Sequence, residues 1–386
     1  MQFDETINNF FSNQSLDLSI RGPLPRFLDQ KVQPDVLTIV SRSIAKLFSK
    51  DNIWFTRKEL QTEEFTNSIV KKYFGKPDTK EVKAANEYDK FFGQILNFLR
   101  FYNVLNFKKQ NNLHYYQVKN LKVIRYISND THNSNNFITL ANKNFIQQNK
   151  LSKDFDKFFN SQTNTSLNDL KIQFKKFLHS KTNIKKDYEV GRIFTPFLNP
   201  LAFEKNKYGT EKGRLSRVQI SFTDLLYART NWKDLTHGKP KNITRKEWLS
   251  KIADEEMPDD NAEKIAKDDI KERHKDISEY SGQTGAIHTH HIFPKFDFEK
   301  LKSFKENLIR LTPNEHLVMA HPDGKTQQVD TTFQKELLKA KLKSINESLK
   351  LKDGFYDLKY FINAINIGFN KNLPTDMSLS EIKKHI

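Results

Sequence analysis

Residues 285–324 read GAIHTHHIFPKFDFEKLKSFKENLIRLTPNEHLVMAHPDG, and this stretch predicts a strand, a loop, a second strand and a short helix. The first strand is a β-branched and apolar run that ends at Pro294, and residues 307–311 (NLIRL) predict the second strand. The helix begins at residues 312–315 (TPNE). This sequence combines a capping threonine, a proline at the first helical position and a glutamate that closes a capping box.

Histidine is concentrated in this stretch. The chain has 11 histidines, and five of them lie within it: His288, His290, His291, His316 and His321. Composition alone does not account for such a concentration; the alternative is a set of ordinary surface or buried histidines on a hairpin. The chain has no cysteine. Disulfides and thiolate-ligated zinc are therefore excluded, and a metal ion would need His, Asp, Glu or Asn as ligands.

The segment resembles the HNH, or ββα-metal, endonuclease family, which includes the nuclease domains of colicins. The matching residues are the pair His290-His291 on the first strand, Asn307 at the start of the second, and His316 in the first turn of the helix. The resemblance implies that His290 and His316 bind a metal, that His291 is the general base and that Asn307 braces the loop. It also implies one divalent metal ion, with Mg²⁺ or Mn²⁺ expected first, although Zn²⁺, Ni²⁺ or Co²⁺ would bind imidazoles better.

One position departs from the family pattern. Many relatives carry another ligand four residues after the helix histidine, but that position is Ala320 here, and His321 comes one residue later. Residues five apart on an α-helix do not share a face. His321 can serve as a ligand only where the chain leaves the helix, which Pro322 favours. Its alternative roles are a phosphate contact or a surface residue.

The composition favours a polyanionic partner. The 386 residues carry a formal charge of +17 and a pI near 9.5, which suits double-stranded DNA, although a lysine-rich composition also arises in AT-rich genomes. A 37% apolar fraction and 32 phenylalanines can fill real cores, so the disordered class is excluded. No long apolar run or secretory signal is visible, so we expect a cytoplasmic protein without membrane contact.

The N-terminal region, residues 1–120, predicts an arm followed by helices and a hairpin. Apolar spacing indicates helices from Pro34 onward, and Thr56 with Glu59 forms a capping box at the start of one of them. A polar KKQNN tip between two strand-like runs then indicates a hairpin. This order is typical of a winged helix, in which Arg100, Lys108 and Lys109 would face phosphate. A small helical domain with a solvated hairpin is the alternative.

Residues 121–187 predict a helical connector, and residues 188–386 a basic segment, the HNH core at 286–324 and C-terminal helices. The whole chain is thus expected to be α+β and mainly helical. A charged helix from about 262 to 280 is interpreted as a solvated face. The basic side chains placed to contact DNA are Lys212, Arg214, Arg217, Arg229, Lys295 and Arg310; a solvated charged surface is the alternative.

These features predict a site-specific, restriction-type DNA endonuclease that leaves 5′-phosphate and 3′-hydroxyl ends. The architecture favours it, because some 280 residues that could supply recognition precede the histidine-rich segment. A nicking, homing or modification-dependent nuclease, an RNA-cleaving enzyme, and a DNA-binding regulator with an inert HNH remnant are the alternatives. Each hairpin-helix unit cuts one strand, so a double-strand break requires a homodimer or sequential nicks.

Overall fold

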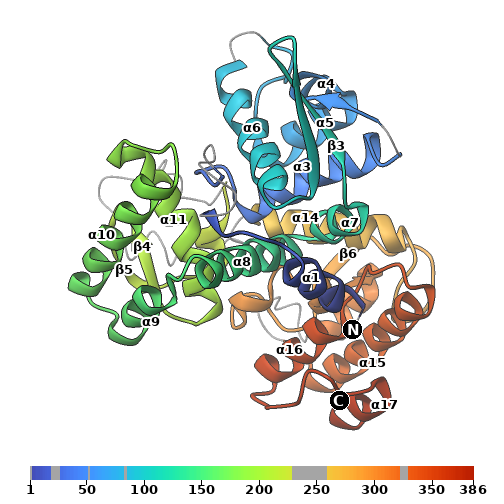
Figure 1. Ribbon diagram of the computed structural model, residues 1–386. Coiled ribbons are helices and arrows are strands. Elements are labelled where there is room, and N and C mark those ends of the chain that lie inside the picture. Colours follow the sequence, from blue (N-terminus) through green and yellow to red (C-terminus); the bar gives the residue numbers. More distant parts are fainter. Residues whose placement is uncertain (1, 19–26, 51–52, 82–84, 228–258, 322–328) are drawn as a thin grey trace, which may run out of the picture. The chain divides into compact units, whose positions relative to one another are not determined.

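The computed structural model describes residues 2–18, 27–50, 53–81, 85–227, 259–321 and 329–386. It is mainly helical with small antiparallel sheets, which confirms the α+β, mostly helical class (Figure 1). The chain divides into two compact units, Met1–Arg229 and Thr230–Ile386. Among the described residues, no helix has the length and apolarity needed to span a membrane.

The first part of unit 1 contains a three-stranded sheet and the helices around it. After α1 (Gln2–Ser12) come α3 (Pro34–Leu47), β1 (Phe55–Thr56), α4 (Arg57–Thr62), α5 (Glu64–Phe74), α6 (Ala85–Phe101), β2 (Leu105–Gln110) and β3 (Leu113–Val118). The strands are antiparallel in the order β1-β3-β2. Thr56 caps α4 and Glu59 completes the box, as predicted. The hairpin turns at Asn111 and Asn112, both with positive φ.

The remainder of unit 1 is helical up to a second hairpin. The elements are α7 (Leu121–Asn129), α8 (Thr131–Gln148), α9 (Ser152–Ser161), α10 (Asn164–Lys181), α11 (Asp187–Glu204), β4 (Tyr208–Glu211) and β5 (Arg214–Gln219). Helix α8 is central, and its Phe137 and Phe145 pack against rings from α1, α6 and α11. Helix α11 packs on α8 and β4. Residues 188–227 therefore lie in unit 1, whereas they were expected to group with the HNH segment.

Unit 2 is built around a short hairpin covered by helices. Its elements are α14 (Asn261–His274), β6 (His288–His291), β7 (Leu308–Leu311), a π-helix (Glu315–Ala320), α15 (Thr331–Leu351), α16 (Leu358–Gly368) and α17 (Leu379–Ile382). Strands β6 and β7 pair antiparallel, with His290 opposite Ile309. Both strands are shorter than expected, and Asn307 lies in a 3-10 turn just before β7.

The C-terminal helices hold the loop that follows β6. Gln334 on α15 donates a hydrogen bond to the carbonyl oxygen of Ile292 (2.7 Å). Gly368 on α16 lies against the ring of Phe293 so closely that a Cβ there would come within 2.1 Å of a ring carbon. Only glycine fits such a contact. Ile292 and Phe293, directly after β6, form one core with the apolar side chains of β7, α15 and α16.

Candidate metal centre

Strand β6 separates its histidines by face. Because side chains alternate along a strand, His288 and His290 share one face and His291 belongs to the other. The ring of His290 lies close to those of His316 and His321. The ring of His291 contacts groups in the following loop and on α14 instead.

The helix after β7 begins with the expected capping box. The Thr312 N–H donates to Oε2 of Glu315 (2.8 Å), and the Glu315 N–H donates to Oγ1 of Thr312 (3.3 Å). Ser278 fixes the same carboxylate through its hydroxyl (2.7 Å). The His316 N–H donates to the Thr312 carbonyl (3.0 Å), so His316 lies in the first turn as predicted.

This helix is a π-helix from Glu315 to Ala320. Its backbone bonds span five residues, so its turn is wider than an α-turn, and a residue five positions on returns closer to the starting face. His321 follows at φ −121°, ψ 96°, where the chain becomes extended. Because the turn is wider and the chain leaves the helix at His321, the His321 ring can approach that of His316 although the two residues are five positions apart rather than four. Ala320, which occupies the family's ligand position, is fully buried in the core.

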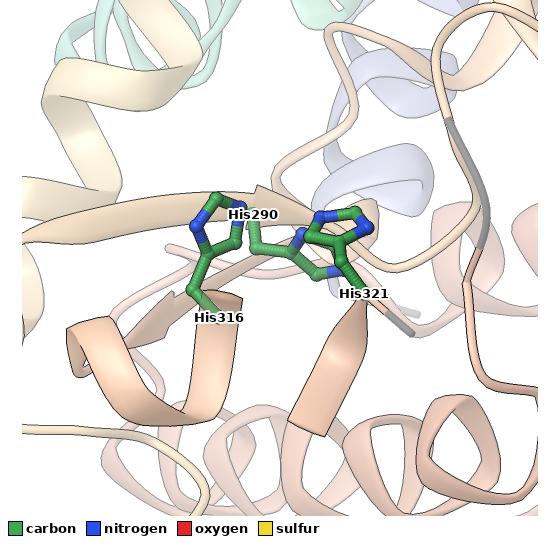
Figure 2. A group of neighbouring side chains, drawn as sticks. All are labelled: His290, His316 and His321. Carbon is green, nitrogen blue, oxygen red and sulfur yellow. The ribbon is translucent and has the colours of Figure 1, made fainter. Parts of the chain in front are cut away.

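His290, His316 and His321 converge. Each offers one ring nitrogen, and these atoms all lie within 4.8 Å of one another. The ring centroids are 5.1 Å apart for His290 and His316, 5.0 Å for His290 and His321, and 4.9 Å for His316 and His321. Figure 2 shows the rings arriving from β6, from the start of the π-helix and from its end. We call these three residues the histidine cluster.

Two nitrogens of the histidine cluster are buried without a hydrogen bond to any described residue: Nε2 of His290 and Nδ1 of His316. Buried polar atoms nearly always have partners, so such orphans need another explanation. Burial, and then the neighbouring histidines, lower the pKa of His290 well below its usual range, and the same causes lower the pKa of His316 to about 4. Both rings are neutral at pH 7. Neutral imidazoles with free lone pairs fit a divalent metal ion.

A fourth histidine accompanies the cluster. The ring of His288 stacks on that of His316, with centroids 4.6 Å apart and planes 19° apart. Sequence reasoning assigned no role to His288. The available signal was its spacing of two from His290, which places both residues on one face of a strand.

His291 has two acceptors at the same ring nitrogen. Its Nε2 lies 3.0 Å from the carbonyl oxygen of Lys302 and 3.3 Å from Oε1 of Glu263. Burial, and then the charge of Lys267, lower the pKa of His291 to about 3, so its ring is neutral at pH 7. Only 11% of its side chain is exposed.

Glu263 belongs to a buried charged network on α14. Its Oε1 also lies 3.0 Å from Nζ of Lys267 and 3.4 Å from Nζ of Lys295. Burial and the adjacent Asp259 raise the pKa of Glu263 to about 7. Burial would also raise the pKa of Asp259, but hydrogen bonds from Glu263 and Lys267 outweigh it and lower that pKa. The two carboxyl groups therefore share a proton. The solvated face expected for this helix holds for Lys264, Lys271 and Glu272, which are exposed, but not for Glu263, which is only 2% exposed.

Asn307 ties the loop together. Its Nδ2 donates to the carbonyl oxygens of Phe293 (3.0 Å) and Leu301 (3.2 Å), and its Oδ1 accepts from the Phe293 N–H (2.8 Å). Its own carbonyl accepts from the Ile292 N–H (2.8 Å). These contacts are the bracing that the resemblance implied for Asn307. They fix the path of the chain directly after His291.

Two cations of this unit that were expected to contact DNA are engaged internally. Arg310 is 7% exposed; its Nε donates to the Lys275 carbonyl (2.9 Å), and its Nη1 reaches Oγ1 of Thr289 (3.4 Å). Lys295 pairs with Asp259 (3.1 Å) and Glu263. Lys295 and Arg310, which were expected to face phosphate, are held in this structure by nearby carboxylate and carbonyl oxygens.

The other predicted DNA contacts lie in unit 1. Lys212, Arg214 and Arg217 are exposed on the β4–β5 hairpin, and Lys108 and Lys109 are exposed on the β2–β3 hairpin. Arg100 instead lies over the ring of Phe107, 3.3 Å from its centroid, and burial lowers its pKa. Arg100, also expected to face phosphate, is thus partly buried against this ring. Arg229 lies outside the described residues.

Comparison with protein-family models, with curated proteins and with solved structures found no match.

Proposed function

We propose that this protein is a metal-dependent DNA endonuclease of the restriction type, and that the histidine cluster is its metal centre. The observation that carries the proposal is the convergence of three imidazoles on a strand–strand–helix unit, with two ring nitrogens left without partners among the described residues. Structural histidines satisfy their buried nitrogens, whereas metal ligands keep a lone pair for the ion.

His290, His316 and His321 would hold the ion. A bound divalent ion would supply Lewis acidity to a phosphodiester oxygen and stabilise charge on the leaving oxygen. Three nitrogen donors suit Zn²⁺, Ni²⁺ or Co²⁺ better than Mg²⁺ or Mn²⁺, which prefer oxygen. The donor set therefore favours the first group, although the family resemblance alone puts Mg²⁺ or Mn²⁺ first.

His291 is the proposed general base. With its Nε2 proton directed at the Lys302 carbonyl, Nδ1 carries the lone pair that would take a proton from water. Its low pKa in the free protein keeps this lone pair available at neutral pH. An anionic phosphate bound beside the ring would raise that pKa and strengthen the base. Asn307 keeps the loop, and with it the Lys302 region, in place.

Unit 1 is proposed to recognise double-stranded DNA. Its order of α3, β1, α4, α5, α6 and a β2–β3 hairpin, with strand order β1-β3-β2, supports a winged helix. Both hairpins of unit 1 present exposed basic side chains. Lys108, Lys109, Lys212, Arg214 and Arg217 are the proposed phosphate contacts.

The decisive experiment incubates metal-stripped protein with supercoiled plasmid and genomic DNA, adding Zn²⁺, Ni²⁺, Co²⁺, Mn²⁺ or Mg²⁺ separately. Discrete fragments with 5′-phosphate ends support restriction, a single nick per plasmid supports a nicking enzyme, and a smear supports a nonspecific nuclease. Binding without cutting under every metal supports the inert regulator instead. Incubation with structured RNA in parallel tests the alternative that the protein cleaves RNA.

The matched variants are His291→Ala and His288→Ala. The first should abolish cutting while metal and DNA binding persist. The second removes a ring beside the cluster and should retain metal binding. Equal cutting by His291→Ala and the unmodified protein would contradict the assigned base.

A further inference from the structure

The contacts of Glu263 indicate a functional role for a residue that lies outside the histidine-rich segment. Glu263 lies on α14, before the segment in the chain, yet its Oε1 is 3.3 Å from Nε2 of His291. The other neighbour of this nitrogen is the Lys302 carbonyl, at 3.0 Å. Carbonyl and carboxylate oxygens both accept, so Nε2 must carry the ring proton. The lone pair then lies on Nδ1.

The position of Glu263 is itself fixed from several sides. Lys267 and Lys295 both approach its Oε1, and its main-chain N–H donates to Asp260, the N-cap of α14 (2.9 Å). Asp260 also pairs with Nζ of Lys302 (3.0 Å). The helix that carries Glu263 and the loop that carries the Lys302 carbonyl are therefore tied to each other. The Glu263 carboxyl group and the Lys302 carbonyl, the two acceptors of His291 Nε2, are thereby held in fixed positions relative to each other.

We propose that Glu263 is a positioning residue for His291: it fixes the Nε2–H tautomer and holds the ring with Nδ1 ready to accept a proton from water. This inference rests on the proposed function for its catalytic consequence. A base oriented by a third, buried acceptor is the arrangement that activates nucleophiles in unrelated hydrolases. Glu263 contacts His291 rather than the histidine cluster, so its loss should affect turnover more than metal binding.

The test compares Glu263→Gln with Glu272→Gln. Glu272 lies on the same helix and is exposed, and Glu272→Gln makes the same carboxyl-to-amide change away from His291. Glu263→Gln should lower kcat roughly 10–100-fold, the range known for residues that orient reactive groups, with KM and Zn²⁺ affinity unchanged. Glu272→Gln should behave like the unmodified protein. A kcat within twofold for Glu263→Gln, or a loss shared with metal affinity, overturns the inference.

A second readout needs no activity. Long-range ¹H–¹⁵N correlation spectra of ¹⁵N-histidine-labelled protein, with His291 assigned from a His291→Gln variant, report which nitrogen carries the proton. The unmodified full-length protein should show His291 as the Nε2–H tautomer. An Nδ1–H tautomer overturns the inference whether or not the protein cuts DNA. Absence of cutting by the unmodified protein with every metal would instead defeat the proposed function, and the tautomer would remain measurable.

Discussion

His316 and His321 are five residues apart in the chain, yet their ring centroids are 4.9 Å apart with planes nearly perpendicular at 87°. An α-helix would direct two such side chains to different faces. The π-helix between them widens the turn and brings them together. Irregular helical turns of this kind cost backbone regularity and often occur at functional sites. The local geometry therefore serves the histidine cluster.

His321→Ala should weaken Zn²⁺ binding by more than the roughly 100-fold that loss of an outer-shell contact causes, because it removes a direct ligand. Isothermal titration or chelator competition measures the change. Moving the histidine back to the α-helical spacing, in Ala320→His combined with His321→Ala, should not restore affinity, since position 320 faces the core. Recovery by the double variant would show that the turn reverts to an α-helix. His288→Ala is the matched control and should leave affinity within a few-fold.

Acid should destabilise the metal-free protein between pH 6.5 and 4. The pKa of His291 falls to about 3 and that of His316 to about 4 on folding, whereas an unfolded histidine titrates near 6.5. The unfolded chain then binds more protons in this window, so stability is full above pH 6.5 and declines as the pH falls. Urea unfolding with EDTA at pH 7, 5.5 and 4.5 measures the decline. His291→Gln should flatten it, and an unchanged slope would contradict the assignment.

Asn307→Ala should reduce the free energy of unfolding by about 2–4 kcal/mol, because it leaves the Phe293 N–H and two carbonyl groups without their buried partner. Chemical denaturation measures the loss. Asn314→Ala is the control, since Asn314 is exposed on the following helix and should change stability by less than about 0.5 kcal/mol. Equal effects of the two substitutions would refute the bracing role.

The hairpin lysines should contribute to DNA affinity through phosphate contacts. Lys108→Ala with Lys109→Ala should weaken binding for all sequences and reduce the slope of log K against log salt by about two, one for each contact. Binding titrations from about 50 to 200 mM salt test this. Arg310→Gln serves as a contrast, because its side chain is committed to the Lys275 carbonyl. That variant should lower stability and leave the salt slope unchanged.

Local signals in the sequence predicted much of unit 2. The β6–β7 pairing, the capping box at Thr312 and the position of His316 follow from strand patterns and capping chemistry, which act over a few residues. The π-helix was not predictable, because Leu317 to Met319 suit an α-helix equally well. The sequence therefore left open whether His321 is a metal ligand.

The engagement of several charged side chains did not follow from the sequence. Glu263 was interpreted as part of a solvated face, and Lys295 and Arg310 as DNA contacts, but each has a partner distant in the chain. Charge patterns alone do not distinguish a solvated helix face from a buried network. The same limitation applied to Arg100, whose guanidinium packs on Phe107. Tertiary contacts decided these cases, and a single sequence contains no record of them.

The contact between Gly368 and the Phe293 ring sets a limit on engineering. Phe293 is also where Asn307 anchors the loop after β6, so helix α16 supports the segment from behind. A transplant of residues 286–324 into another scaffold would lose this support, together with the carboxylate that α14 brings to His291. A chimera that preserves the geometry of the histidine cluster and His291 must therefore include the surrounding helices, so unit 2 as a whole is the part to transfer.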